Sequence, residues 1–95
     1  MAIGFDGLVL GGRYGIYAKM AEGSFGEIHR VKDRVRNKLY AAKSEYNRTN
    51  TPQLEYEYSV YLALRGLPGI PNVHWFGKKQ GHKFMVMDFL GCKRG

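Results

Sequence analysis

Short runs of alternating apolar and polar residues cover the first half of the chain, separated by turns rich in Gly, Asn and charged residues. Residues 14–20 and 27–32 flank a Gly-rich turn, a pattern typical of a β-hairpin. Residues 39–44 follow a polar turn and give a third strand despite their two alanines. Together these segments predict an antiparallel sheet.

A helix is predicted over residues 52–65, after a loop rich in Asn and Thr. Thr51 and Pro52 are residue types that favour the N-cap and the first helical position. Gly66 and Pro68 end the helical pattern. Four apolar side chains recur at i, i+4, i+7 and i+8 and predict one stripe that packs on the sheet, namely Leu54, Tyr58, Tyr61 and Leu62.

Two further strands are predicted at residues 72–77 and 83–90, joined by a polar turn. The expected fold is therefore α+β, a five-stranded antiparallel sheet with one helix in the order βββαββ. A length of 95 residues suits one small domain.

The chain is basic, with 15 Lys and Arg against 8 Asp and Glu, a net charge of +7. Polyanions are thus plausible partners, although the densest basic segment, residues 30–38, is short and typical of a solvated surface. A basic sheet with aromatic residues can also stack single-stranded bases, so a nucleic-acid-binding module is one alternative.

Cys92 is the single cysteine, which excludes an internal disulfide and favours a reducing compartment, cytoplasmic or nuclear. No run approaches the roughly 20 apolar residues that a membrane span needs, and no basic leader precedes the first apolar residues. His29, His74 and His82 fall on separate predicted strands or turns, so no metal site is expected.

Candidate chemistry begins at the turn "EGSFGE", where Gly23 and Gly26 serve either a tight turn or the close approach of backbone amides to a phosphate. A phosphate site needs a cation nearby, and Lys43 lies on the next predicted strand. Glu57, on the polar edge of the helix stripe, can hold that ammonium if the helix packs against the sheet. The alternative is that Lys43 extends to solvent and Glu57 is simply exposed.

Five segments then occur in an order and spacing that resemble a protein-kinase small lobe: "GSFGEI", "YAAK", "TPQLEYE", "LPGIPNVHWFG" and "MVMDFLG". They are most similar to the casein kinase I family of serine/threonine kinases. The resemblance covers residues 9–91, leaving residues 1–8 as an N-terminal extension and 92–95 as a tail.

The resemblance implies an ATP-binding lobe. Lys43 would hold the α- and β-phosphates with Glu57 as its partner, and Met87 would be the gatekeeper residue before the hinge. Tyr61 would stack against the large lobe. The implied ATP-binding set is Ala21, Gly23, Ser24, Phe25, Gly26, Ile28, Ala41, Lys43, Met87, Asp88, Phe89 and Leu90.

Two departures from the kinase pattern change the expected activity. Ala21 stands where the first loop glycine belongs, which is expected to weaken nucleotide affinity without abolishing it. The HRD, DFG and APE motifs do not occur, so the 95 residues contain no expected catalytic residue. Transfer of the ATP γ-phosphate to protein Ser or Thr, with Mg²⁺, is expected only if a large lobe is supplied. The other alternative is a non-catalytic fragment that binds a kinase or regulator through its interlobe face.

Overall fold

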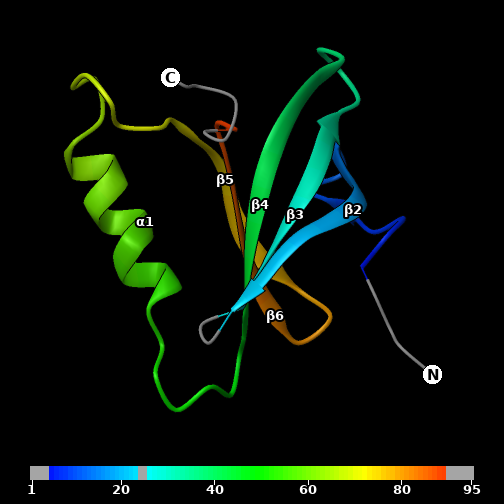
Figure 1. Ribbon diagram of the computed structural model, residues 1–95, viewed down its shortest axis with the longest axis horizontal. Helices are drawn as coiled ribbons and strands as arrows, with labels where there is room; N and C mark the ends of the chain where they lie inside the picture. The colour runs from blue at the N-terminus through cyan, green and yellow to red at the C-terminus, as the bar shows by residue number, and fades with distance from the viewer. Residues whose placement is uncertain (1–4, 24–25, 90–95) are drawn as a thin grey trace.

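The computed structural model describes residues 5–23 and 26–89 (Figure 1). They form one antiparallel sheet and one helix, which confirms the α+β prediction. The spatial order of the strands is β1-β2-β3-β4-β6-β5. The elements are β1 (Val9–Leu10), β2 (Tyr14–Gly23), β3 (Gly26–Asp33), β4 (Lys38–Tyr46), α1 (Leu54–Ala63), β5 (Val73–Lys79) and β6 (His82–Met87).

The predicted count of five strands is wrong, because the described residues form six. The additional strand, β1, has two residues and pairs Val9 with Gly15 and Leu10 with Tyr14. Two residues are too few to produce a visible alternation in the sequence. Just before β1, Phe5 and Leu8 also pack against the core, so this segment covers part of the sheet.

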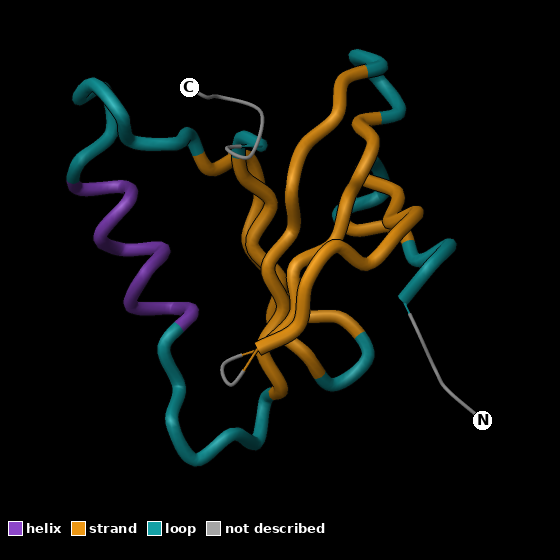
Figure 2. The backbone as a smooth tube through the Cα atoms, viewed as in Figure 1, coloured by secondary structure: helices purple, strands orange, loops and turns teal. Residues whose placement is uncertain are grey.

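Both faces of the sheet carry a buried core. The outer core faces the N-terminal segment and comprises Leu10, Tyr14, Ile16, Val31, Tyr40, Ala42, Phe84 and Val86. The helix-side core faces α1 and comprises Ala41, Leu54, Met85 and Met87. Figure 2 shows α1 on one side of the sheet and the N-terminal segment on the other. Strand β3 contributes apolar residues to both faces of the sheet, with Val31 in the outer core and Ile28 against the helix-side core. Its sequence therefore does not show a regular alternation of apolar and polar residues.

The predicted start of the helix is wrong. Helix α1 begins at Leu54, and Gln53 in the N-cap position makes no side-chain cap. The cap comes from the sheet, because Glu45 Oε2 on β4 accepts hydrogen bonds from the Gln53 and Leu54 amides at 2.6 and 3.0 Å. Thr51 remains in the loop, where its amide donates to Thr49 Oγ1.

The predicted apolar stripe of α1 is only partly buried against the sheet. Leu54 is the one buried residue of the helix, while Leu62 is 37% exposed. Tyr58 stacks on Phe76 of β5 with ring centroids 4.5 Å apart. The helix therefore rests on the sheet through few apolar contacts.

A buried carboxylate holds the turn between β3 and β4. Asp33 accepts two hydrogen bonds of 2.8 Å from the Arg13 guanidinium and further ones from the amides of Val35 and Arg36. The Arg13 contact and these amides keep the pKa of Asp33 well below its ordinary value, although burial opposes this. The pair ties the start of β2 to the far end of β3.

His29 on β3 is buried in the outer core at 1% exposure. Its ring meets Phe5 edge to face, with centroids 5.3 Å apart. Neither ring nitrogen makes a hydrogen bond within the described residues, although Nε2 lies 3.2 Å from Glu27 Oε1. Burial lowers the pKa of His29 below its ordinary value, against the opposing charges of Glu27 and Asp6. Folding thus favours the neutral form of this imidazole.

We expect the free energy of unfolding to fall as the pH is lowered from 7.5 to 5.5. Because the pKa of His29 is lower in the folded state, the unfolded chain gains the proton first, and stability is lost below about pH 6.5, the ordinary histidine pKa. The slope contributed by this one group is at most about 1.4 kcal/mol per pH unit.

Urea unfolding of the wild type and His29→Gln at several pH values in this range measures the effect. The carboxylates with lowered pKa values, Glu22, Asp33 and Asp88, lose their stabilising charge only at lower pH. The variant should lose most of the wild-type slope, whereas an unchanged slope would show that another group causes it.

Candidate functional site

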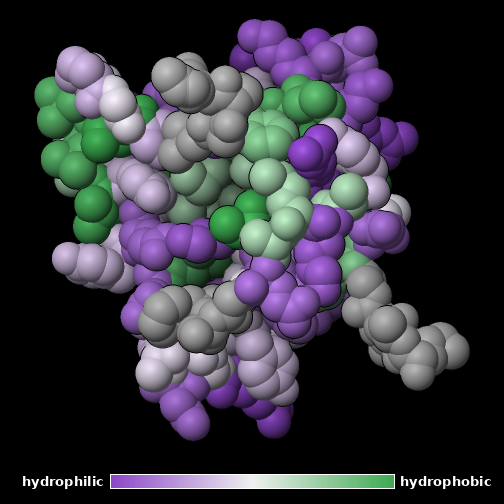
Figure 3. Space-filling view, in the orientation of Figure 1, coloured by the Kyte–Doolittle hydropathy of each residue, from purple (hydrophilic) through white to green (hydrophobic). Residues whose placement is uncertain are grey.

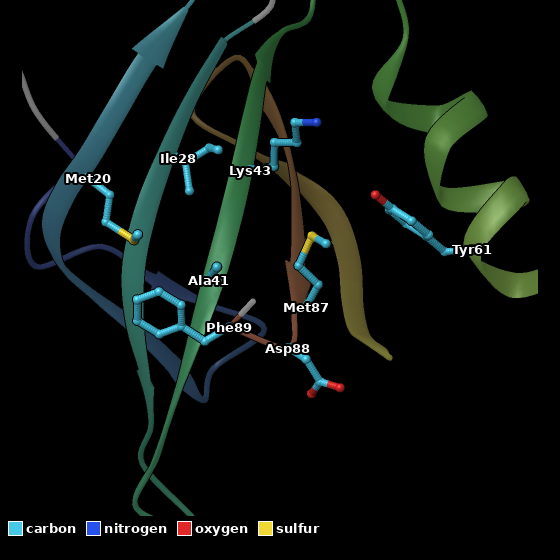
Figure 4. A pocket seen from close by; sticks show the side chains of 8 residues that line it. All are labelled: Met20, Ile28, Ala41, Lys43, Tyr61, Met87, Asp88 and Phe89. Carbon is cyan, nitrogen blue, oxygen red and sulfur yellow. The ribbon is translucent and has the colours of Figure 1, made fainter. Parts of the chain in front are cut away.

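A cleft of about 320 Å³ lies between the sheet and α1 (Figure 4). Strands β2, β3, β4 and β6, the helix and the segment after β6 all contribute to it. Its lining residues are Met20, Ile28, Ala41, Lys43, Tyr61, Met87, Asp88 and Phe89. Its volume lies at the lower end of the range for small-molecule sites.

The walls of the cleft are mostly apolar. Ala41 and Met87 form the floor on neighbouring strands, where they are paired across the sheet. Ile28 lies above them on β3 (Figure 4). A narrow apolar space next to a cation suits a ligand with a flat ring and an attached anion, because each part meets a matching surface.

The cation of the cleft is Lys43, at the end where β4 faces the helix (Figure 4). Its Nζ donates to Glu57 Oε1 at 2.7 Å, and both side chains are about 30% exposed. The structure therefore brings together the lysine and the glutamate that the sequence paired fourteen residues apart. Solvent access leaves the ammonium free to contact an anionic ligand as well.

Asp88, the first residue of the predicted hinge, turns its carboxylate away from the cleft (Figure 4). Oδ1 lies 2.8 Å from His74 Nε2 and Oδ2 accepts from the Asn72 amide, while the Asp88 amide donates to the Asn72 carbonyl. Burial opposes ionisation of Asp88, but these hydrogen bonds outweigh it and lower its pKa. The side chain thus fastens the end of β6 to the start of β5, a role that sequence reasoning missed for both His74 and Asp88.

Six residues of the predicted ATP-binding set line the cleft: Ile28, Ala41, Lys43, Met87, Asp88 and Phe89. Ala21 is exposed and pairs with Ile28, and Gly23 pairs with Gly26 at the end of the hairpin. These three, Ala21, Gly23 and Gly26, do not line the cleft. The predictions for Ser24, Phe25 and Leu90 lie outside the described residues.

Two lining residues were not in the predicted set. Tyr61 directs its hydroxyl from α1 towards the sheet, although the resemblance assigned it to a contact with a large lobe (Figure 4). Met20 reaches the cleft from β2, where irregular pairing with β3 between Lys19 and Ala21 shifts the register. The alternation of residues along β2 could not have indicated which face of the sheet Met20 lies on, because such irregularities break the period of two.

Gly26 has a structural requirement of its own. Its φ is +134°, and a Cβ at this position would overlap the carbonyl oxygen of Ser44 on β4. Strand β3 can therefore approach β4 closely at this point only without a side chain. Ser44 strengthens the same contact, since its hydroxyl donates to the Glu27 carbonyl at 3.4 Å.

Metal ligands do not gather in the part of the chain that the structure describes. Across residues 5–23 and 26–89, no three His, Cys, Asp or Glu side chains converge on one point. Helix α1, the helix within these ranges, is too short to cross a membrane.

The sheet, the single helix and the lysine–glutamate pair across the cleft fit the small lobe of a protein kinase. Comparison with known proteins agrees. The chain is 40% identical over 83 residues to casein kinase I homolog 3 of Schizosaccharomyces pombe, and 41% and 42% identical to homologs 1 and 2 of the same organism. Each match covers 87% of this chain and 19% of the relative.

The chain is thus homologous to a segment of the casein kinase I homologs and spans about a fifth of their length. No protein-family model matches it.

Replacing Gly26 with Ala should destabilise the chain by at least about 2 kcal/mol, because the new Cβ overlaps Ser44 and the backbone must shift. Gly12→Ala is the matched control. Its φ is also positive, +70°, but no atom lies within 4 Å of the position that a Cβ would take, so only the backbone strain of about 1 kcal/mol remains. Urea unfolding of both variants measures the difference, and equal losses would contradict a steric role for Gly26.

Proposed function

We propose that this chain is the ATP-binding lobe of a serine/threonine protein kinase of the casein kinase I type. The observation that carries the proposal is the apolar cleft with the Lys43–Glu57 ion pair at one end. Homology to the casein kinase I homologs supports the same choice. The single cysteine is consistent with a location in the cytoplasm or nucleus.

Different residues of the cleft would contact different parts of ATP. The adenine ring would lie between Ile28 and the floor formed by Ala41 and Met87, with the backbone of residues 88–90 as the hinge. Lys43 would contact the α- and β-phosphates while Glu57 holds its ammonium in place. The amides near Gly23 and Gly26 would add hydrogen-bond donors over the phosphates.

Phosphoryl transfer itself would need a large lobe. Transfer to a Ser or Thr hydroxyl requires an aspartate that orients this hydroxyl and further groups that hold Mg²⁺. Within the described ranges, the carboxylates closest to the cleft are those of Glu57, which is paired with Lys43, and Asp88, which is bonded to His74 and the Asn72 amide. We therefore assign the lobe to ATP binding, and catalysis to the complete kinase.

One alternative has an observation in its favour. Leu62, Leu64 and Leu67 are 37–55% exposed at the end of α1 and in the following loop. Figure 3 shows hydrophobic atoms gathered at this edge. This surface would also suit a fragment that binds a kinase or a regulator. ATP binding needs the cleft, whereas such protein binding does not.

Lys43→Ala should weaken ATP binding at least tenfold, about 1.4 kcal/mol, because the ammonium is lost from the cleft. Lys79→Ala removes the same charge from the exposed end of β5 and should leave the affinity within twofold. Isothermal titration with Mg-ATP, supported by thermal shift, measures both. If Mg-ATP neither binds nor stabilises the wild-type chain, nucleotide binding by this chain is excluded. If both variants lose affinity alike and binding weakens steeply with salt, the nucleic-acid-binding alternative is favoured.

A further inference from the structure

Helix α1 carries Glu57, yet the helix has little apolar anchorage, with Leu54 its one buried residue. Tyr58 and Tyr61 pack against the helix-side core while partly exposed, and polar contacts from the sheet add to them. Glu45 holds the Gln53 and Leu54 amides, Lys43 holds Glu57, and Lys83 lies 3.7 Å from Glu55. Two of these three contacts come from one strand, β4.

Glu45 and Lys43 lie two residues apart on β4, so their side chains leave the same face of the sheet. Glu45 accepts from the amides of Gln53 and Leu54, and the Glu57 amide in turn donates to the Gln53 carbonyl at 2.9 Å. The glutamate that meets Lys43 is therefore one helical turn from the residues that Glu45 holds. The same strand sets both the position of the cation and the position of its partner.

The burial of Glu45 makes this contact sensitive to substitution. The residue is 4% exposed, and its second oxygen, Oε1, has no hydrogen-bond partner within the described residues. A carboxylate accepting amide hydrogen bonds at a helix N-terminus is favoured by both the unpaired amides and the helix dipole. Gln53 makes no side-chain cap of its own, and Glu45 supplies the acceptor for the first amides of α1.

We propose that Glu45 is a positioning residue of the nucleotide site, which fixes the N-terminus of α1 so that Glu57 reaches Lys43. The proposal rests on the proposed ATP binding for its functional consequence. Without the acceptor at Glu45, the first turn of α1 loses its attachment to β4. Glu57 then leaves the ammonium in part of the population, and Lys43 is no longer held at the end of the cleft.

The test compares Glu45→Leu, which removes the acceptor, with Glu45→Gln, which keeps an acceptor oxygen at the same reach. Asp33→Asn is the matched control. Asp33 is also a buried carboxylate that accepts two backbone amides, but it lies at the opposite end of the β3–β4 pair from Glu45. All Mg-ATP affinities are measured by titration at a temperature where the variant is folded by circular dichroism.

Glu45→Leu should weaken Mg-ATP binding at least fivefold, Glu45→Gln should stay within twofold of the wild type, and Asp33→Asn should lower the Tm with affinity within twofold. A folded Glu45→Leu with wild-type affinity would overturn the proposal, because Glu45 would then only stabilise the fold. Equal losses in the Leu and Gln variants would overturn the assignment to the amide acceptor. If Glu45→Leu does not fold, Glu45→Asp replaces it, because its shorter side chain should not reach the amides.

Amide hydrogen exchange separates this proposal from the proposed function. In Glu45→Leu the Leu54 and Glu57 amides should exchange at least tenfold faster relative to amides of β4 and β6, while Glu45→Gln should retain wild-type protection. This readout holds even if wild-type protein does not bind Mg-ATP, which would exclude the proposed function alone. Unchanged protection of both amides in Glu45→Leu would overturn the positioning role.

Discussion

The attachment of α1 to β4 is the constraint on which the site depends. Half of the helix residues are exposed, and its one buried side chain is Leu54. Amphipathic helices of globular proteins are mostly held by an apolar face, which tolerates small shifts. Hydrogen bonds tolerate such shifts less well, because they weaken steeply as the distance grows and the angle departs from linear. The contacts from Glu45 and Lys43 are therefore sensitive to small changes in the position of the helix relative to β4.

The sheet can support such a helix because its opposite face is well packed. Phe5 and Leu8 cover the outer core, and Phe5 meets the rings of His29, His82 and Phe84 edge to face. The helix-side face of β4 and β6 can then form the floor of the cleft. Stability and ligand contact are thus divided between the two faces, with Ala42 and Val86 on one and Ala41 and Met87 on the other.

The regular features of the fold could be predicted from local patterns in the sequence. The hairpin around residues 23–26, the helix and the last two strands each follow from a period or a turn signal. The spacing of Lys43 and Glu57 also indicated their contact. The features that were not predicted lack such a local pattern. A two-residue strand has no period, and the helix cap comes from Glu45, which is eight residues away from Gln53 and on a different element.

The Asp88 contacts show the same limit and say something about the cleft. Asp88 belonged to the predicted hinge, but its carboxylate binds His74 and the Asn72 amide. Its amide likewise donates to the Asn72 carbonyl, so the carboxylate and the N–H of Asp88 are both used within the fold and the carboxylate points away from the cleft. The negative charge of Asp88 is held by hydrogen bonds that point away from the cleft, so it lies farther from an anionic ligand near Lys43 than a carboxylate directed into the cleft would. The Asp88 carboxylate thus serves the fold, and the cation that lines the cleft is Lys43, which is paired with Glu57.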